Sequence, residues 1–382
     1  MSDDQLLDRM YGAWLGRCAG CALGKPVEGF MRPHNGLSSK DRIKTYLQAI
    51  DPQEYPLRNY FPKHSPAEDK TGQVHCYAST REDIAYMESD DDIRYTVIGQ
   101  MVLAEHGPKF TSRDVANAWL THLPYRMVCT AETQAYRNLV REQDFHVWPP
   151  SKASIDWLAN ATFENPYREW IGAQIRADSF GYAAPGNPAL AAEFAWRDAR
   201  MSHIANGIYG EMFVAAMIAA AYVLEDPLAI VEAGLAQIPR TSRLHADMRK
   251  VIALCKRHQN DPAKFEKVLD GVYKQLGAYN PVHTNNNAGL VVAALLLSRG
   301  QLHEGITIAV MGGWDTDCNG ATVGSILGAC LGAKKLPNHW TDPLHDTLNA
   351  QIFGYHPIAI SECAKRSLKI ARRCLDDGEK AK

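Results

Sequence analysis

The chain has 382 residues, of which 46% are hydrophobic and 22% are charged. This composition excludes a disordered chain and is sufficient for a large buried core. Because 41 basic side chains nearly balance 43 acidic ones, the formal net charge is -2. No overall field attracts nucleic acid or an anionic membrane surface, and we expect neither as a partner.

The N-terminal segment carries three aspartates in its first ten residues and no apolar run. We therefore expect no secretory signal and a cytoplasmic location. Nine cysteines are scattered along the chain, which fits reduced thiols better than a disulfide framework. Cys18 and Cys21 form a C-x-x-C without a second pair at zinc-site spacing, so we interpret them as small buried helix residues.

Three apolar runs, at residues 212–224, 288–297 and 321–333, are rich in Ala, Leu, Met and Ile. This composition predicts buried helices rather than strands. None of the runs reaches the roughly 18 to 20 residues that a membrane span needs. We find no pattern that predicts a convincing sheet.

Glycines recur every four residues at Gly320, Gly324, Gly328 and Gly332. Glycine costs a helix about 1 kcal/mol relative to alanine, so a row of glycines on one face needs a compensating gain. We expect that a neighbouring backbone approaches this face closely.

Two polar stretches rich in proline and aromatic residues separate the helical blocks, at about residues 31–88 and 143–188. Each is longer than an ordinary connector, which is typical of functional loops or short irregular helices over a binding face. Their aromatic side chains favour burial over a linker role. We therefore expect one all-α domain, residues 1–382, with long loop insertions.

The first acidic cluster, Ser89, Asp90, Asp91 and Asp92, follows Glu88 and precedes an apolar helical pattern. Neighbouring residues do not share a helix face, so these acids are expected at a helix N-terminus, where the dipole favours negative charge. A cap made by Ser89 or Asp90 is the plain alternative. Capping needs only one acid, however, and three in a row favour a ligand role.

The second cluster is Asp315-Thr316-Asp317, flanked by glycines and followed by Cys318. A D-x-D turn beside glycine can direct two carboxylates at one cation. An EF-hand calcium loop is excluded because its twelfth position is Ile326 instead of Glu. The aspartate-rich motif of terpenoid synthases also fails, because Arg94 stands where it requires an acid after the first cluster.

Hard oxygen ligands without a His or Cys set indicate Mg²⁺ or Mn²⁺ rather than zinc. Four carboxylates, from Asp90, Asp91, Asp315 and Asp317, fit two ions. Carboxylates this close repel one another, so they need cations to stay ionised.

At these positions the sequence resembles the ADP-ribosylglycohydrolase family, the enzymes that remove ADP-ribose from proteins. Residues 20–28, Gly-Cys-Ala-Leu-Gly-Lys-Pro-Val-Glu, resemble its Gly-Asp-Ala-x-Gly-x-Pro-x-Glu signature, and residues 89–92 resemble its Thr-Asp-Asp-Thr metal motif. Residues 202–210 are similar to a mid-chain histidine motif, and residues 313–319 to the Gly-x-Asp-x-Asp-Thr-Asn motif. Together the four motifs span nearly the whole chain.

The resemblance implies a compact, orthogonally packed all-α domain with a binuclear Mg²⁺ or Mn²⁺ centre. It assigns metal ligation to five residues and gives Glu28 the role of an acid that gates or activates at the metal edge. The five ligands that it implies are Ser89, Asp90, Asp91, Asp315 and Asp317.

The sequence departs from the family motifs at three positions. Cys21 replaces an acid, Asp92 replaces a threonine, and Cys318 replaces a threonine whose hydroxyl helps to bind metal. A soft thiol in place of a hard hydroxyl is expected to weaken a magnesium site.

Four further residues are candidates for substrate contact. The resemblance places His203, followed by Asn206, beside the distal ribose, with a structural histidine as the alternative. Asn286 belongs to a segment, residues 283–287, that is more polar than a helix cap requires. Arg176, close to two aromatic residues, could clamp a phosphate or serve loop packing. Lys25 could meet a pyrophosphate, although we expect a solvated lysine.

These observations lead to a hypothesis of metal-dependent hydrolysis of a ribosyl glycosidic bond. Glu28 would act as general base or proton relay, and Asp90 or Asp91 would hold the attacking water. The expected substrate is an ADP-ribosylated protein or a small ribosyl conjugate. The alternatives are an N-glycosidase acting on a nucleoside or small ribosyl conjugate, and a noncatalytic structural relative such as certain lens crystallins.

Overall fold

The computed structural model describes residues 1–141 and 155–380, with side chains described as far as Leu375. Within these residues α-helices dominate, and the one sheet has two short antiparallel strands, β1 (Thr347–Leu348) and β2 (Ile358–Ala359). The all-α class expected from the sequence is therefore confirmed. In chain order the helices are α1 (Asp3–Gly24), α2 (Ser39–Ile50), α3 (Glu68–Thr71), α4 (Asp91–His106), α5 (Ser112–His122), α6 (Thr130–Arg141), α8 (Trp157–Thr162), α9 (Asp178–Tyr182), α10 (Pro188–Ala199), α11 (Asn206–Ala221), α12 (Pro227–Leu235), α13 (Arg243–Arg257), α14 (Phe265–Leu276), α15 (Thr284–Ser298), α16 (Leu302–Met311), α17 (Thr316–Leu331), α18 (Asn338–Thr341) and α19 (Ile360–Lys380).

The three apolar runs form the buried helices that the sequence predicts. They lie in α11, α15 and α17, and nearly every side chain of these helices is excluded from solvent. Such helices are apolar on all faces because other helices surround them. Among the described residues, no helix has both the length and the apolar character that crossing a bilayer requires.

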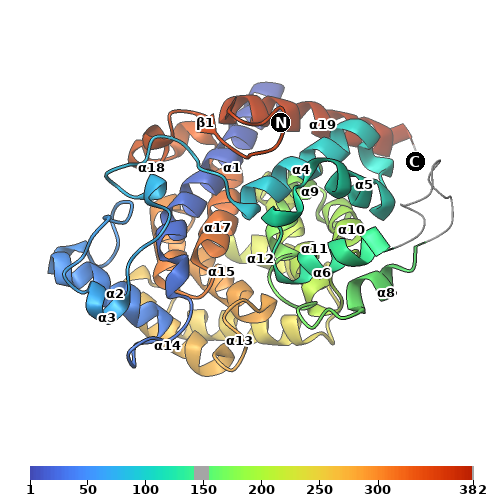
Figure 1. Cartoon of the computed structure of the whole chain (residues 1–382). Helices are drawn as coiled ribbons and strands as arrows, with labels where there is room; N and C mark the ends of the chain where they lie inside the picture. The colour runs from blue at the N-terminus through green and yellow to red at the C-terminus, as the bar shows by residue number, and fades with distance from the viewer. Residues whose placement is uncertain (142–154, 381–382) are drawn as a thin grey trace.

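Helices α1 and α17 pack against each other through their glycines and lie side by side in the middle of the molecule (Figure 1). A Cβ added at Gly20 would come within 2.0 Å of the Gly320 carbonyl oxygen, and one at Gly16 within 2.1 Å of the Gly324 oxygen. The expected close approach of a backbone is thus confirmed. The approaching backbone is that of α1, which has a second row of glycines at every fourth residue. We did not predict this second row from the sequence.

The paired glycines show that the two helices run in opposite directions, since Gly12 meets Gly328 while Gly24 meets Thr316. The C-terminal end of α1 therefore lies against the first turn of α17. Helix α19 covers α1 from the other side, where the Trp14 indole donates a hydrogen bond of 3.0 Å to the Ser367 hydroxyl. Glycine packing in this way decides which residues meet at the start of α17.

The described parts of the two polar stretches contain helices as well as loops. The first contains α2, a regular helix that begins at its cap Ser38 and buries one apolar face, including Ile43 and Leu47. Short helical turns and irregular segments make up most of the remainder of this stretch. In the second stretch, residues 143–154 lie outside the described residues, and the part that follows contains α8 and α9.

Candidate active site

Three helix ends bring the predicted site residues together. Asp90 is the N-cap of α4 and accepts a hydrogen bond of 3.0 Å from the Asp92 backbone amide, while Asp315 is the N-cap of α17. Glu28 lies in the 3₁₀ helix η1 (Lys25–Phe30), directly after α1. Both aspartate clusters therefore stand at helix N-termini, where the helix dipole stabilises negative charge.

The two acidic clusters, more than two hundred residues apart in the sequence, face each other. Ligand atoms of Glu28, Asp315 and Asp317 lie within 4.8 Å of one another, and the same holds for Cys21, Asp90 and Asp317. Asp92, Asp317 and Cys318 form a further group of this kind. A fourth group consists of Asp90, Asp91 and Asp92, so Asp317 belongs to three of the four groups.

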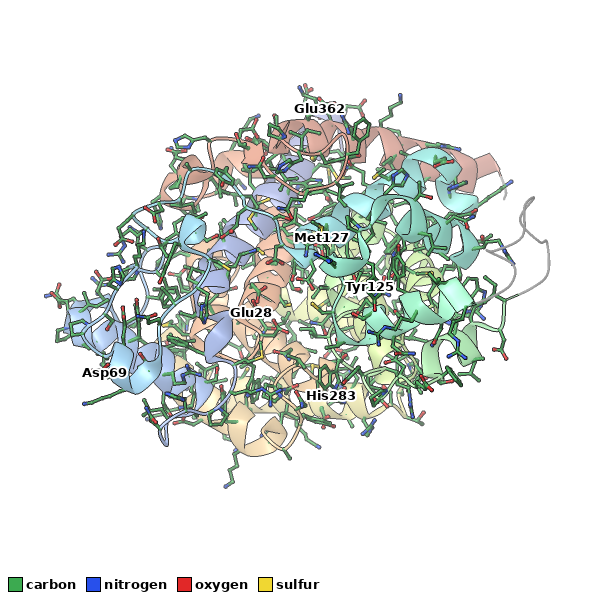
Figure 2. All side chains as sticks on the ribbon, in the orientation of Figure 1. Glu28, Asp69, Tyr125, Met127, His283 and Glu362 are labelled. Carbon is green, nitrogen blue, oxygen red and sulfur yellow. The ribbon has the colours of Figure 1, made fainter. Side chains whose placement is uncertain are left out.

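A cavity of about 300 Å³ opens beside these acids. Its lining includes the carboxylates of Glu28, Asp91, Asp315 and Asp317 together with Trp170 and other apolar residues. Figure 2 shows Glu28 near the middle of the molecular face, at the end of α1. A half-apolar cavity with converging carboxylates is typical of a small-molecule site.

Crowding of carboxylates in a buried place changes their acidity. Burial, together with the charges of Asp315, Asp90 and Asp91, raises the pKa of Glu28 to about 8. Burial and the Asp90 charge likewise raise the pKa of Asp91 to about 7. Burial and neighbouring acids raise the pKa of Asp317 as well. Raised pKa values are expected for acids that share one buried site without a cation.

Two buried oxygen atoms of the second cluster lack hydrogen-bond partners. Asp315 Oδ1 and Asp317 Oδ1 are buried and have no hydrogen-bond partner among the described residues. Buried polar atoms are nearly always paired, and carboxylate oxygens are the ligands that Mg²⁺ and Mn²⁺ prefer. These residues therefore fit a hard divalent cation.

The first cluster, in contrast, contacts cationic side chains. Lys25 Nζ lies 2.8 Å from Asp90 Oδ2 and donates to the Ser89 carbonyl oxygen at 2.5 Å. Burial raises the pKa of Asp90, but the Lys25 charge outweighs it and the net pKa is lowered. The expectation of a solvated Lys25 is wrong, because only 6% of this residue is exposed.

Two of the three departures from the family motifs contact each other. The Cys318 thiol donates a hydrogen bond to Asp92 Oδ2 at 3.1 Å, and Asp92 also accepts one from Arg17 Nη2 at 3.2 Å. Burial raises the pKa of Cys318, so this sulfur remains a thiol. The third departure, Cys21, is buried in α1 beside Asp90 and Asp317.

Ser89 is close to the acids, but its hydroxyl already has two partners. It accepts from Arg94 Nη1 at 2.7 Å and donates to the Ala350 carbonyl oxygen at 3.2 Å. One lone pair of the oxygen is left for a metal. The structure therefore gives Ser89 a weaker geometric case as a ligand than the aspartates.

The asparagine that supports the site is Asn287, a neighbour of the predicted Asn286. Asn287 Oδ1 accepts from the Asp315 amide at 3.2 Å and from Asn319 Nδ2 at 2.9 Å. Asn286 is buried outside the cavity lining and donates to the Asn280 carbonyl oxygen at 3.1 Å. Neighbouring residues of a helix project in different directions. The sequence does not predict which of these two asparagines of α15 faces the site.

The other predicted substrate contacts lie behind the cavity wall. Arg176 is 1% exposed, and its guanidinium contacts Glu132 Oε1 at 2.6 Å, Asp198, and Glu211 at 3.6 Å. This arrangement matches the packing alternative for Arg176, since its donors are used within the protein. Glu132 itself lines the cavity, and burial raises its pKa to about 7.

His203 and Asn206 are also buried within the protein. His203 Nδ1 lies 2.8 Å from the Ser202 hydroxyl, and its Nε2 lies 3.9 Å from Glu132 Oε1. Asn206 donates to Glu169 at 2.7 Å and accepts from the Leu244 amide at 3.0 Å. Neither residue lines the cavity, but Glu132, which His203 approaches, does.

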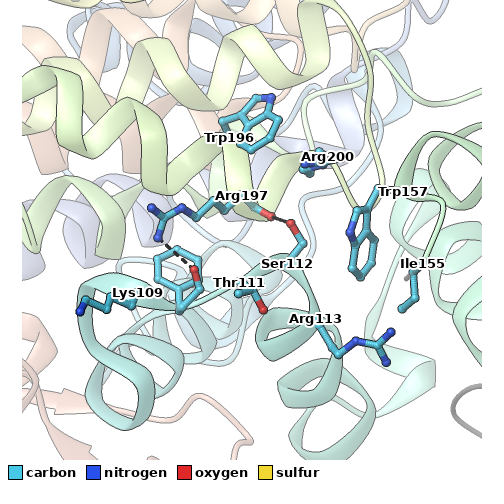
Figure 3. A pocket seen from close by; sticks show the side chains of 10 residues that line it. Lys109, Thr111, Ser112, Arg113, Ile155, Trp157, Trp196, Arg197 and Arg200 are labelled. Carbon is cyan, nitrogen blue, oxygen red and sulfur yellow. Dashed lines mark hydrogen bonds between the residues drawn. The ribbon is translucent and has the colours of Figure 1, made fainter. Parts of the chain in front are cut away.

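A larger cavity, of about 470 Å³, lies away from the acids. Figure 3 shows its lining, which includes Lys109, Arg197, Arg200, Trp157 and Trp196. No carboxylate is among the described residues that line it, so it lacks the groups that hydrolysis at a sugar carbon requires. Volume alone does not identify the reactive site.

Comparison with known proteins identifies the family. The family model described as ADP-ribosylglycohydrolase matches residues 2–374. The chain belongs to the ADP-ribosylglycohydrolase family. This membership confirms the resemblance seen in the four motifs, and it supports hydrolysis of a glycosidic bond as the class of activity.

A solved structure extends the match to the fold. The protein described as "ADP-ribosylglycohydrolase-related protein complex" superimposes with a TM-score of 0.57 over 97% of this chain and 99% of that chain. The two sequences are 19% identical, so the comparison concerns the fold alone. A search of curated proteins finds no match.

Proposed function

We propose that this protein hydrolyses the bond between the anomeric carbon of an ADP-ribosyl group and its acceptor on a protein or small molecule. The observation that carries the proposal is the convergence of Glu28, Asp315 and Asp317, with two orphaned carboxylate oxygens, on the wall of one cavity. Family membership over residues 2–374 supports the same class of reaction.

The centre is proposed to use Mg²⁺ or Mn²⁺, held by Asp315 and Asp317 with Glu28 at its edge. When bound, such an ion polarises oxygen ligands and orients sugar hydroxyls and water. A purely structural role for this site is disfavoured, because buried carboxylates that converge without partners destabilise a fold unless they bind something.

The protein's own side chains divide the remaining work. Asp91, which lines the cavity, accepts a hydrogen bond from the attacking water and fixes its position. Asp90 is less suited to this task, because Lys25 and the Asp92 amide already occupy its two oxygens. Glu28 takes a proton as the water oxygen bonds to the anomeric carbon. The acceptor takes a proton from bulk water as its bond to that carbon breaks, and Glu28 returns its own proton to bulk water.

Release of ADP-ribose from peptides modified on arginine or serine tests this function. We expect release in the presence of Mg²⁺ or Mn²⁺ and its loss after chelation. Glu28→Gln should lower turnover by about 10²- to 10⁴-fold, whereas Glu105→Gln, the same change on an exposed residue of α4, should not. Wild-type turnover of Glu28→Gln would remove Glu28 from the mechanism.

A second candidate, hydrolysis of a nucleoside or small ribosyl conjugate, is favoured by one observation. The cavity of about 300 Å³ is at the small end of the range of about 300 to 1,000 Å³ for ligand pockets. Such a volume suits a ribose and a small leaving group better than a whole ADP-ribosyl group. Parallel assays with free nucleosides and with modified peptides separate the two candidates.

A further inference from the structure

The positive charges of the protein are distributed unevenly between the two acidic clusters. In the first cluster Lys25 pairs with Asp90 at 2.8 Å, and Arg17 pairs with Asp92 at 3.2 Å. Arg94 donates to the Ser89 hydroxyl at 2.7 Å. Three cationic side chains therefore already contact Ser89, Asp90 and Asp92 in the first cluster.

The second cluster has no such neutralisation. Among the described side chains, those of residues 1–141 and 155–375, no Lys, Arg or His forms an ion pair of 4.0 Å or less with Glu28, Asp315 or Asp317. Asp315 and Asp317 each retain an oxygen without a hydrogen-bond partner. The demand for an external cation is thus concentrated on this side of the centre.

The Lys25 ammonium is fixed in its position by the fold. Lys25 is the residue that directly follows α1, and α1 is held against α17 by the glycine contacts that end at Gly24 and Thr316. Only 6% of Lys25 is exposed, and its Nζ has two oxygen acceptors, on Ser89 and Asp90. A side chain confined in this way cannot swing into solvent to make room for an ion.

An ammonium group and a divalent cation compete for the same carboxylate oxygen and repel each other at short range. Asp90 accepts from Lys25 on one oxygen and from the Asp92 amide on the other, so an ion ligated by Asp90 would lie close to this confined ammonium. We infer that the centre holds a single divalent cation, at Glu28, Asp315 and Asp317, and that Lys25 supplies the positive charge that a second ion would otherwise provide.

This inference rests on the proposed metal-dependent function and replaces the two-ion expectation from the sequence. It also gives Lys25 a role as a positioning residue, because its ammonium pairs with Asp90 at 2.8 Å and holds that carboxylate in place. A lysine that served folding alone would change stability on substitution, but it would not change the number of ions that bind.

Stoichiometry of Mn²⁺ binding by the full chain is the test, measured by calorimetry and by elemental analysis after gel filtration. Electron paramagnetic resonance adds an independent readout, since two Mn²⁺ ions about 4 Å apart couple magnetically and one ion does not. We expect one uncoupled ion per wild-type chain. Two ions per wild-type chain would overturn the inference but leave the metal-dependent function standing, whereas no bound ion would overturn both.

Variants of Lys25 assign the effect to its charge. Lys25→Met keeps an unbranched side chain without the ammonium and should bind a second, coupled ion, whereas Lys25→Arg should stay at one. Lys40→Met, which removes a surface lysine paired with Asp41 and Asp270, should also stay at one. A folded Lys25→Met that still binds one ion would contradict the role of Lys25, and should it not fold, the wild-type and Lys25→Arg stoichiometries remain decisive.

Discussion

Gly20 of α1 and Gly320 of α17 meet backbone to backbone, so that a Cβ on either would lie within 2.3 Å of the other's carbonyl oxygen. This contact sets the distance between two antiparallel helices. It therefore also sets where Glu28, just beyond α1, meets Asp315 and Asp317 at the start of α17. The geometry of the acids depends on residues that have no chemistry of their own.

Gly20→Ala should destabilise the protein and weaken its metal binding together. The new methyl group meets backbone atoms that cannot move aside, and overpacking of this kind typically costs about 1 to 3 kcal/mol. Gly99→Ala is the control, because its Cβ would meet the Ser179 side chain at 3.1 Å and helix propensity favours alanine. Thermal unfolding measures both. Equal stability of the two variants would contradict the packing argument.

Arg176→Met should lower the free energy of unfolding by about 3 to 5 kcal/mol, because it leaves buried carboxylates without their cation. Glu132, Asp198 and Glu211 are the acids concerned. Chemical denaturation measures the change. A variant of unchanged stability that binds substrate poorly would instead support the phosphate-clamp role that the sequence suggested for Arg176.

Metal affinity should rise with pH between about 6 and 9. The pKa values of Glu28 and Asp91 are raised to about 8 and about 7, so below these values the metal-free protein carries protons that a cation must displace. As pH rises these protons are lost and the competition ends. Calorimetry in two buffers of different ionisation enthalpy counts the released protons, and a pH-independent affinity with no release would refute this assignment.

Cys318→Thr should strengthen Mg²⁺ binding relative to Mn²⁺. A hydroxyl is a harder donor than the thiol that now contacts Asp92, and changes next to a metal site typically alter affinity by about 10- to 100-fold. Cys330→Thr, at the other end of α17, is the matched control. Titrations of both variants with each metal provide the comparison, and equal Mg²⁺ affinities would show that Cys318 does not face the ion.

Much of the architecture could be predicted because it depends on composition along the chain. Apolar runs gave α11, α15 and α17, and the four-residue glycine spacing indicated close helix packing. The two acidic clusters were recognisable because acids this dense exceed what helix capping needs. That they lie together is seen only in the structure, and their metal and substrate roles stay predictions.

The rest of the site depends on side-chain direction, which sequence spacing does not fix. One residue separates Asn287, which supports Asp315, from Asn286, which does not. Lys25 looked like a surface lysine because its partner Asp90 is 65 residues away in the sequence. The spacing of Gly12, Gly16, Gly20 and Gly24 was visible in the sequence and would have indicated the helix that pairs with α17.

A crystal grown with Mn²⁺ and examined by anomalous scattering tests the central claim most directly. The account predicts a peak bounded by the carboxylates of Asp315 and Asp317, with Glu28 at its edge and the cavity beside it. The absence of a peak there at millimolar Mn²⁺, or a peak that lies only at distant surface carboxylates, would contradict it.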